Sequence, residues 1–343
     1  MRGRTNTMSR PYVHLQTENK LNQLLAELNE SLHIFKSLDG IQGILLDGGL
    51  SRGYADELSE IDILIFLEKE MYQYYQQGNC PFALGITVID GALYDIKLAD
   101  YEEEYKKEYD QVALWDLSYA SILYDPNQKM SDLIERKLSE PIHIGGGYGF
   151  LWEAYWTYKL AGDIWIHRQD VLQGHMMFSS AIKPLLSALF IANKEYVPHD
   201  KWLVHMSRTL EWKPDRYEEL LQGAMNTGDF TVQSLVERQK CIDTLWCAIN
   251  QKFCEMEQYT GSLNIIQKGS YDALRNMLSK EEYTVEEWQK EHNLEELNEE
   301  PVHTLFRRKG EKILLDKESF LNLKPQDMYS WMYEIVDAAR TNR

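Results

Sequence analysis

The sequence predicts an α+β protein in which a mixed sheet comes first and a helical region follows. Between residues 41 and 99, short apolar runs alternate with turns that contain glycine, which is typical of strands in a sheet. From residue 150 to about residue 259, apolar and aromatic residues recur at helical spacing, which is typical of a helical bundle. A chain of 343 residues is long enough for two domains and a small appendage. We therefore expect a sheet domain at 1–140, a helical bundle at 141–260 and a C-terminal extension at 261–343.

Hydrophobic periodicity predicts the elements of the first domain. Leucines from Leu21 to Leu32 recur at helical spacing and predict a helix at 18–37 that ends near Gly40. Two runs flank Asp90-Gly91, a dipeptide that favours a tight hairpin. We expect strands at residues 41–46, 60–67, 82–89, 92–99 and 121–124, and further helices at 69–77, 101–110 and 128–139. In the strand at 60–67, apolar residues alternate with acids, so we expect helices on one face of the sheet and a site on the other.

The positions of glycine and proline residues predict the boundaries of the later elements. The glycines Gly145–Gly147 indicate a linker or a helix start, because neither a preceding strand nor a following Lys-Ser/Thr pair makes them a phosphate loop. In the C-terminal extension we expect an acidic helix at 279–299. A hairpin at Leu305–Leu315, turning at Lys309-Gly310, and an amphipathic helix from Pro325 complete the expected elements.

The residues between Gly48 and Asp62 are the candidate site. Gly48-Gly49 ends an apolar run, and glycines at a strand end let backbone N–H groups approach phosphate oxygens closely. Glu60 and Asp62 are two apart on a strand, so their carboxylates project from one face about 6–7 Å apart. Mg²⁺ takes one or two carboxylates and completes its shell with phosphate oxygens and water. The stretch therefore predicts a site for a metal and a nucleoside triphosphate.

Asp95 is a third candidate carboxylate. It lies on the strand at 92–99, where Asp95 and Lys97 share one face and Tyr94 and Ile96 the other. If this strand lies beside the strand at 60–67, Asp95 joins Glu60 and Asp62. The alternative is that Asp95 is only a polar position of an edge strand.

Charge and cysteine content limit the classes of partner. The chain has 36 Lys and Arg against 54 Asp and Glu, a formal net charge of −18, which opposes binding to nucleic acid or to an anionic membrane and suits a cationic small molecule. No apolar stretch reaches the roughly 18 residues of a membrane helix, and residues 1–8 lack the apolar core of a secretory signal. The four cysteines have no metal-ligand spacing, and Cys247 and Cys254 are expected as buried thiols. We expect a cytoplasmic protein.

The stretch from Gly48 to Asp62 resembles the nucleotidyltransferase superfamily that includes DNA polymerase β and the antibiotic nucleotidyltransferases. The shared pattern is a glycine turn, about ten further residues, and an acid–apolar–acid strand, here Glu60-Ile61-Asp62. Ser51-Arg52-Gly53 after the turn is most similar to the aminoglycoside- and lincosamide-type enzymes that carry a helical C-terminal domain. Two residues depart from the pattern: Gly49 stands where many members have serine, and Glu60 replaces the commoner aspartate.

The resemblance implies an activity and roles for individual residues. It implies a Mg²⁺-dependent enzyme that transfers a nucleoside monophosphate to an acceptor hydroxyl and releases pyrophosphate. The expected donor is ATP, so the transferred group would be AMP. Metal ligation falls to Glu60, Asp62 and Asp95, with Asp95 alternatively acting as the base. Contacts to the triphosphate fall to Gly48, Gly49, Ser51, Arg52, Lys201 and Lys183. Glu153 is a candidate for gripping the acceptor or for taking its proton.

Several functions stay open at this point. The leading one is adenylylation of a small hydroxylated and cationic molecule such as an aminoglycoside-like antibiotic. A second is adenylylation of a protein, as in antitoxin members of the superfamily, although those are short single domains. A third is a non-catalytic nucleotide-binding regulatory protein on the same fold, which the departures at Gly49 and Glu60 leave open.

Overall fold

The protein, seen here in a computed structural model, is described from residue 15 to residue 341, so the predicted features of residues 1–8 lie outside the described part. The chain forms two compact units. One comprises Met1–Gly147 and Leu186–Glu218, and the other Tyr148–Leu185 and Glu219–Arg343. The first boundary lies close to the predicted end of the sheet domain at residue 140. Residues 186–218, predicted as part of the bundle, belong instead to the N-terminal unit, and the predicted extension at 261–343 shares a unit with the rest of the bundle.

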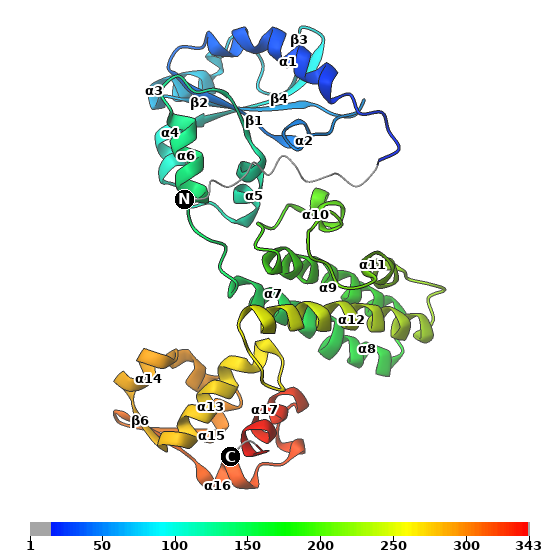
Figure 1. The fold of residues 1–343 in the computed structure, drawn as a ribbon, viewed down its shortest axis with the longest axis vertical. Coiled ribbons are helices and arrows are strands. Elements are labelled where there is room, and N and C mark those ends of the chain that lie inside the picture. The colour runs from blue at the N-terminus through cyan, green and yellow to red at the C-terminus, as the bar shows by residue number, and fades with distance from the viewer. Residues whose placement is uncertain (1–14, 342–343) are drawn as a thin grey trace. The chain divides into compact units, whose positions relative to one another are not determined.

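A five-stranded mixed sheet lies at the centre of the first unit (Figure 1). Its strands are β1 (Ile41–Leu46), β2 (Ile61–Leu67), β3 (Gly85–Ile89), β4 (Ala92–Asp100) and β5 (Ser121–Tyr124). They lie in the order β3-β4-β2-β1-β5, with β2 and β4 parallel and the other neighbours antiparallel. Asp90 and Gly91 have φ angles of 51° and 90° and form the hairpin turn between β3 and β4. The predicted strands and mixed sheet are confirmed.

Helices cover parts of both faces of this sheet (Figure 1). On one face Leu28 and Phe35 of α1 (Leu21–Lys36) pack against alternate residues of β1 and β2 such as Ile63. On the other face, Leu45 of β1 and Phe66 of β2 are buried with residues of α5 (Gln111–Tyr119) and α6 (Lys129–Leu138). The prediction placed helices on one face only. It was incomplete because Leu45 and Phe66 make the second face apolar toward one end, whereas Asp62 keeps it polar toward the other.

Shorter helices complete the first unit. They are α2 (Gly48–Ser51), α3 (Lys69–Tyr74), η2 (Tyr75–Asn79), α4 (Tyr101–Lys106) and α10 (Asp200–Ser207). The sequence pattern predicted no helix at 111–119, where the structure has α5. This helix starts because the Asp110 side chain accepts a hydrogen bond from the backbone N–H of Ala113 at 2.8 Å, an N-cap.

The helical region contains α7 (Gly146–Tyr155), η3 (Trp156–Ala161), α8 (Gly162–Arg168), α9 (Val171–Ala192), α11 (Tyr217–Met225) and α12 (Val232–Met256). Because α7 begins at Gly146, the helix-start interpretation of the glycine triplet is confirmed. Helix α9 has 22 residues and is long and apolar enough to cross a membrane, which corrects the prediction that no stretch is that long. Of its most apolar window 72% is buried inside the structure, as in the core helix of a globular protein.

All four cysteines are free. Cys254 is buried, as expected, but Cys247 is exposed, so the expectation of two buried thiols was wrong for Cys247. Both lie on α12, seven residues apart, so the helical period alone places them within about 20° of the same face. The neighbours Leu245 and Trp246, rather than Cys247, fill the apolar face there.

The C-terminal residues have a core of their own. Their elements are η4 (Ile265–Gln267), α13 (Lys268–Lys280), β6 (Glu282–Thr284), α14 (Val285–Glu291), η5 (Leu294–Asn298), α15 (Val302–Leu305), β7 (Phe306–Lys309), β8 (Lys312–Leu315), α16 (Lys317–Asn322), η6 (Pro325–Asp327) and α17 (Ser330–Thr341). The strands form a sheet in the order β6-β8-β7. The predicted hairpin is confirmed, with Gly310 at a φ of 63° in its turn, and so is the final helix.

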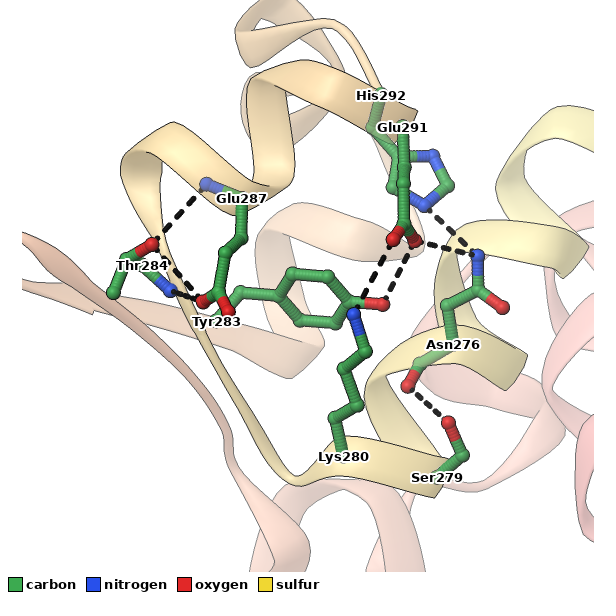
Figure 2. A network of polar contacts seen from close by, with 8 residues as sticks. All are labelled: Asn276, Ser279, Lys280, Tyr283, Thr284, Glu287, Glu291 and His292. Carbon is green, nitrogen blue, oxygen red and sulfur yellow. Dashed lines mark hydrogen bonds and ion pairs between the residues drawn. The ribbon is translucent and has the colours of Figure 1, made fainter.

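The predicted acidic helix at 279–299 is broken, and Figure 2 shows why. Thr284 caps α14 through reciprocal bonds with Glu287, which requires an extended backbone just before the helix. Tyr283 on β6 donates from its hydroxyl to Glu291 at 3.0 Å, and Lys280 at the end of α13 lies 3.3 Å from the same carboxylate. These contacts hold α13, β6 and α14 together as three elements where the charge pattern predicted one.

Candidate functional site

The glycine turn after β1 is packed against a carboxylate of β2. The backbone N–H of Asp47 donates to the carbonyl of Asp62 at 3.0 Å, which fixes the turn beside the strand. Gly48 has a φ of +69°, and a Cβ at this position would lie 1.8 Å from Oδ2 of Asp62. The first glycine is therefore required twice, by its left-handed backbone and by the space that the carboxylate occupies.

Asp62 lies in a strongly acidic environment. Burial, followed by the charges of Glu60 and Asp47, raises its pKa to about 6, with only Lys97 acting in the opposite direction among the groups that affect it most. Repulsion of this kind disfavours the ionised form until a cation arrives. The acids at the start of β2 thus form an oxygen-rich site with incomplete charge compensation.

Asp95 lies beside Asp62, as the matching strand patterns predicted. In the parallel pairing of β2 with β4, Asp62 and Asp95 are register partners and therefore point to the same face. The carboxylate of Asp95 is already engaged, since its Oδ2 lies 2.8 Å from Nζ of Lys97. Burial lowers the pKa of Lys97, but the bond to Asp95 and the nearby acids outweigh this effect and raise it overall.

A cavity of about 320 Å³ lies over these residues, entirely within the first unit. Its lining includes Asp47, Gly48, Gly49, Arg52, Tyr54, Asp56, Leu58, Ser59, Glu60, Asp62, Lys97, Asp116, His199, Lys201 and Trp202. Of the residues that the sequence singled out, the cavity brings together Gly48, Gly49, Arg52, Glu60, Asp62 and Lys201. Asp95 and Ser51 do not line it. The lining combines carboxylates with lysines, which suits a metal-bound phosphate chain.

Arg52 has a different position from the one expected for a phosphate ligand. Its side chain is only 2% exposed and forms ion pairs with Asp47, at 3.6 Å, and with Asp116. The guanidinium also lies 4.3 Å from the ring centroid of Trp115 and 5.3 Å from that of Trp202. Arg52 thus joins the glycine turn to α5 and α10, so that it positions the wall of the cavity.

Ser51 was expected to replace the missing hydroxyl of Gly49 as a phosphate contact. The structure contradicts this role. Ser51 is 2% exposed, and its hydroxyl donates to the carbonyl of Gly48 at 2.9 Å. The side chain therefore stabilises the glycine turn from inside.

Asp47, Lys97 and Asp116 are cavity residues that the sequence interpretation missed. Asp47 directly precedes the glycine pair, and this adjacency could have identified it. Asp116 could not be found in this way, because it lies on α5, a helix that the pattern did not reveal. Burial, with a smaller contribution from the charge of Asp47, raises the pKa of Asp116 to about 6, although Arg52 opposes the shift.

Three candidates were predicted within the bundle, and the structure places only one of them at the cavity. Lys201 lies in the first turn of α10, is exposed and lines the cavity. Next to it, His199 also lines the cavity, and burial followed by the charges of Arg52 and Lys201 lowers its pKa. Lys183 and Glu153 belong to the second unit, where both are exposed, and neither is among the cavity residues.

The donor atoms of the cavity fit a hard divalent cation. All the candidate ligands are carboxylates, and Oδ1 of Asp47 is a buried acceptor that lacks a hydrogen-bond donor, its nearest cation being Arg52 at 3.6 Å. Between residues 15 and 341, no three Asp, Glu, His or Cys side chains are grouped closely enough to form a complete metal site.

Comparison with known proteins identifies the family of the sheet domain. Residues 28–139, which include the glycine turn and all three predicted ligands, match the model of the nucleotidyltransferase domain family. A crystal structure of a nucleotidyltransferase-like protein from Exiguobacterium sibiricum 255-15 is similar at 12% sequence identity and a TM-score of 0.36, over 85% of this chain and 98% of that one. A search of curated proteins gives no match. Residues 28–139 of this chain therefore form a nucleotidyltransferase domain.

Proposed function

We propose that this protein is a Mg²⁺-dependent nucleotidyltransferase that moves a nucleoside monophosphate, AMP from ATP, onto a hydroxyl of a small molecule and releases pyrophosphate. The observation that supports this most directly is the cavity in which Glu60 and Asp62 face a glycine turn and Lys201. The net charge of −18 favours a cationic acceptor, such as an aminoglycoside-like antibiotic, over nucleic acid. The proposal places the reaction in the cytoplasm.

The acids, lysines and glycines of the cavity have definite tasks in this reaction. Glu60 and Asp62 would hold Mg²⁺, which when bound offsets phosphate charge and stabilises the attacking and leaving oxygens. Lys97 and Lys201 would attract the triphosphate, while the backbone of Gly48 and Gly49 lets it approach closely.

The transfer also needs a proton acceptor. The acceptor oxygen forms a bond to the α-phosphorus, the bond to pyrophosphate breaks, and the hydroxyl proton leaves to a carboxylate. Asp116 can take this proton at Oδ2, because its Oδ1 is bound to Arg52. A pKa of about 6 lets this group be ionised at neutral pH and still accept a proton.

The test is direct. The full chain is incubated with Mg²⁺, each nucleoside triphosphate and a panel of hydroxylated antibiotics, and products are identified by mass while pyrophosphate is measured. Asp62→Asn should reduce turnover by at least 100-fold, because it removes the negative charge of a proposed metal ligand while the side-chain volume stays the same. Glu57→Gln is the matched control, an exposed acid in the loop that precedes β2 and does not line the cavity, and should retain wild-type turnover. Equal turnover in Asp62→Asn and wild type would refute the assignment.

A non-catalytic nucleotide-binding regulator is the second candidate, because Asp95 is engaged with Lys97 instead of facing the cavity. A protein with this function should bind Mg²⁺–ATP tightly and should form no product with any acceptor. Calorimetric ATP binding measured beside the turnover assay separates the two.

A further inference from the structure

We propose that the ammonium group of Lys97 takes the place of a second metal ion, so that the cavity over the glycine turn holds one divalent cation. This role rests on the proposed function for its catalytic meaning. It depends on the contacts of three side chains that face the same side of the sheet, those of Asp62, Asp95 and Lys97.

Asp62 and Asp95 occupy adjacent positions on two parallel strands. They are register partners in the pairing of β2 with β4, and neighbouring strands lie about 4.8 Å apart. Sites that hold two catalytic ions keep those ions about 3.5–4 Å apart. Two carboxylates at this spacing, with Glu60 beside Asp62, would therefore offer oxygen ligands to a pair of ions if both carboxylates were available.

Lys97 already supplies a positive charge to Asp95. It lies two residues after Asp95 on β4, so both side chains project from the same face of the strand. Its Nζ lies 2.8 Å from Oδ2 of Asp95. Among the groups that most affect the pKa of Asp62, Lys97 alone lowers it, because its positive charge offsets the neighbouring acids. One ammonium group thus compensates the charge of both register partners.

The lining of the cavity distinguishes the two carboxylates. Glu60, Asp62 and Lys97 line the cavity, whereas Asp95 does not. A divalent cation that enters the cavity therefore meets the carboxylates of Glu60 and Asp62, while the carboxylate of Asp95 is occupied by the lysine. Arg52 has a different role, because it is buried in the cavity wall.

A fixed positive charge at this position has a definite effect on the transfer. The acceptor oxygen bonds to the α-phosphorus while the bond to pyrophosphate breaks, and the hydroxyl proton leaves to Asp116. Negative charge is then spread over the attacking and leaving oxygens. Lys97 stays protonated throughout and offsets part of this charge, and it neither gives nor takes a proton. The lysine thereby supplies at this point the positive charge that a second ion would otherwise supply.

The number of bound Mn²⁺ ions tests this role without turnover. The full chain is dialysed to equilibrium against Mn²⁺ and α,β-methylene-ATP, whose carbon bridge prevents release of pyrophosphate. The excess of metal and nucleotide on the protein side gives the number of each bound per chain. The wild-type chain should retain one Mn²⁺ with one nucleotide. Lys97→Met, which removes the charge and keeps a long side chain, should retain two Mn²⁺, because the carboxylate of Asp95 is released.

Control variants keep this test specific. Lys97→Met combined with Asp95→Asn should return to one ion, which identifies Asp95 as the added ligand. Lys97→Arg keeps the charge, and Lys201→Met removes the other lysine of the same cavity, so each should retain one ion. The side chain of Lys97 is 64% exposed, and exposed ion pairs contribute at most about 1 kcal/mol, so these chains should stay folded. Two ions in the wild-type chain, none in it, or one ion in both Lys97→Met and Lys97→Gln would each overturn the role.

Activity assays separate failure of this role from failure of the proposed function. If nucleotide is transferred while the wild-type chain retains two ions, the function holds and the role of Lys97 is wrong. If the ion counts are as expected while no acceptor gains a nucleotide, Lys97 replaces an ion and the catalytic function is wrong. A loss of turnover of tenfold or more in Lys97→Met, partly restored by raising the Mg²⁺ concentration, supports both.

Discussion

At the scale of single residues, Gly48 is where backbone and site chemistry are most tightly coupled. Replacing it with alanine would place a Cβ 1.8 Å from Oδ2 of Asp62 at a φ of +69°, so we expect Asp62 to be displaced. The free energy of unfolding should fall by about 1–3 kcal/mol and turnover by about tenfold or more.

Gly49 is the matched control for this substitution. A Cβ there meets only the carbonyl of Tyr54, at 3.1 Å, and its φ is not left-handed, so Gly49→Ala should be much milder. Urea denaturation and steady-state kinetics of both variants check the contrast. Equal losses in the two variants would show that the packing against Asp62 is unimportant.

Asp62 should lower the stability of the protein at neutral pH. Its pKa is raised to about 6 in the folded chain from 3.8, so the folded state binds its proton more tightly than the unfolded state does. The stability cost is therefore full above about pH 6 and disappears as the pH falls towards 4. We expect Asp62→Asn to raise the free energy of unfolding by about 1–2 kcal/mol at pH 7.5, and the gain to shrink at pH 5. A constant or absent difference between the two pH values would contradict the shifted pKa.

At the scale of elements, α5 forms one side of the cavity over the glycine turn. The helix carries Trp115, which packs on Arg52, and Asp116, which lines the cavity. Its first turn depends on the cap formed by Asp110. Asp110→Ala should cost about 1 kcal/mol of stability, whereas Asp110→Ser, which keeps a capping oxygen, should stay close to wild type.

Thermal denaturation of the two Asp110 variants measures this difference. The melting temperature should fall for alanine by a few degrees and hardly at all for serine. Equal falls for both would mean that the carboxylate acts through charge and not as a cap.

At the scale of the whole molecule, the first unit is not continuous in sequence. Residues 186–218 return to it after part of the helical region and supply His199, Lys201 and Trp202 to the cavity. A chain ending at residue 147 should therefore lose Mg²⁺–ATP affinity by at least tenfold relative to the full chain, because Trp202 no longer covers Arg52 and Lys201 is absent. Calorimetry on both chains measures this, and equal affinities would show that residues 1–147 form a sufficient site.

Local pattern was enough to predict the strands, the Asp90-Gly91 hairpin and the face shared by Asp62 and Asp95. These features depend on side-chain alternation and on backbone preferences of glycine and aspartate, which neighbouring residues express directly. Helix α5 escaped prediction because its residues are apolar on most sides, in keeping with a helix that shares a buried cluster with the sheet and α6, so no amphipathic period marks it. Because Asp116 lies on α5, its place in the cavity lining escaped as well.

The sequence by itself determined the glycine turn and the acidic strand, because both are encoded within about twenty consecutive residues. It also determined the order of sheet and helices, through the hydrophobic period of each segment. Only the tertiary structure decided that Arg52 is buried between Asp47 and Asp116, that Ser51 faces inward and that Lys201 belongs to the first unit. The reason is physical. Whether a polar side chain meets a ligand or a protein partner depends on which distant residues desolvate it, and packing across long sequence separations sets that environment.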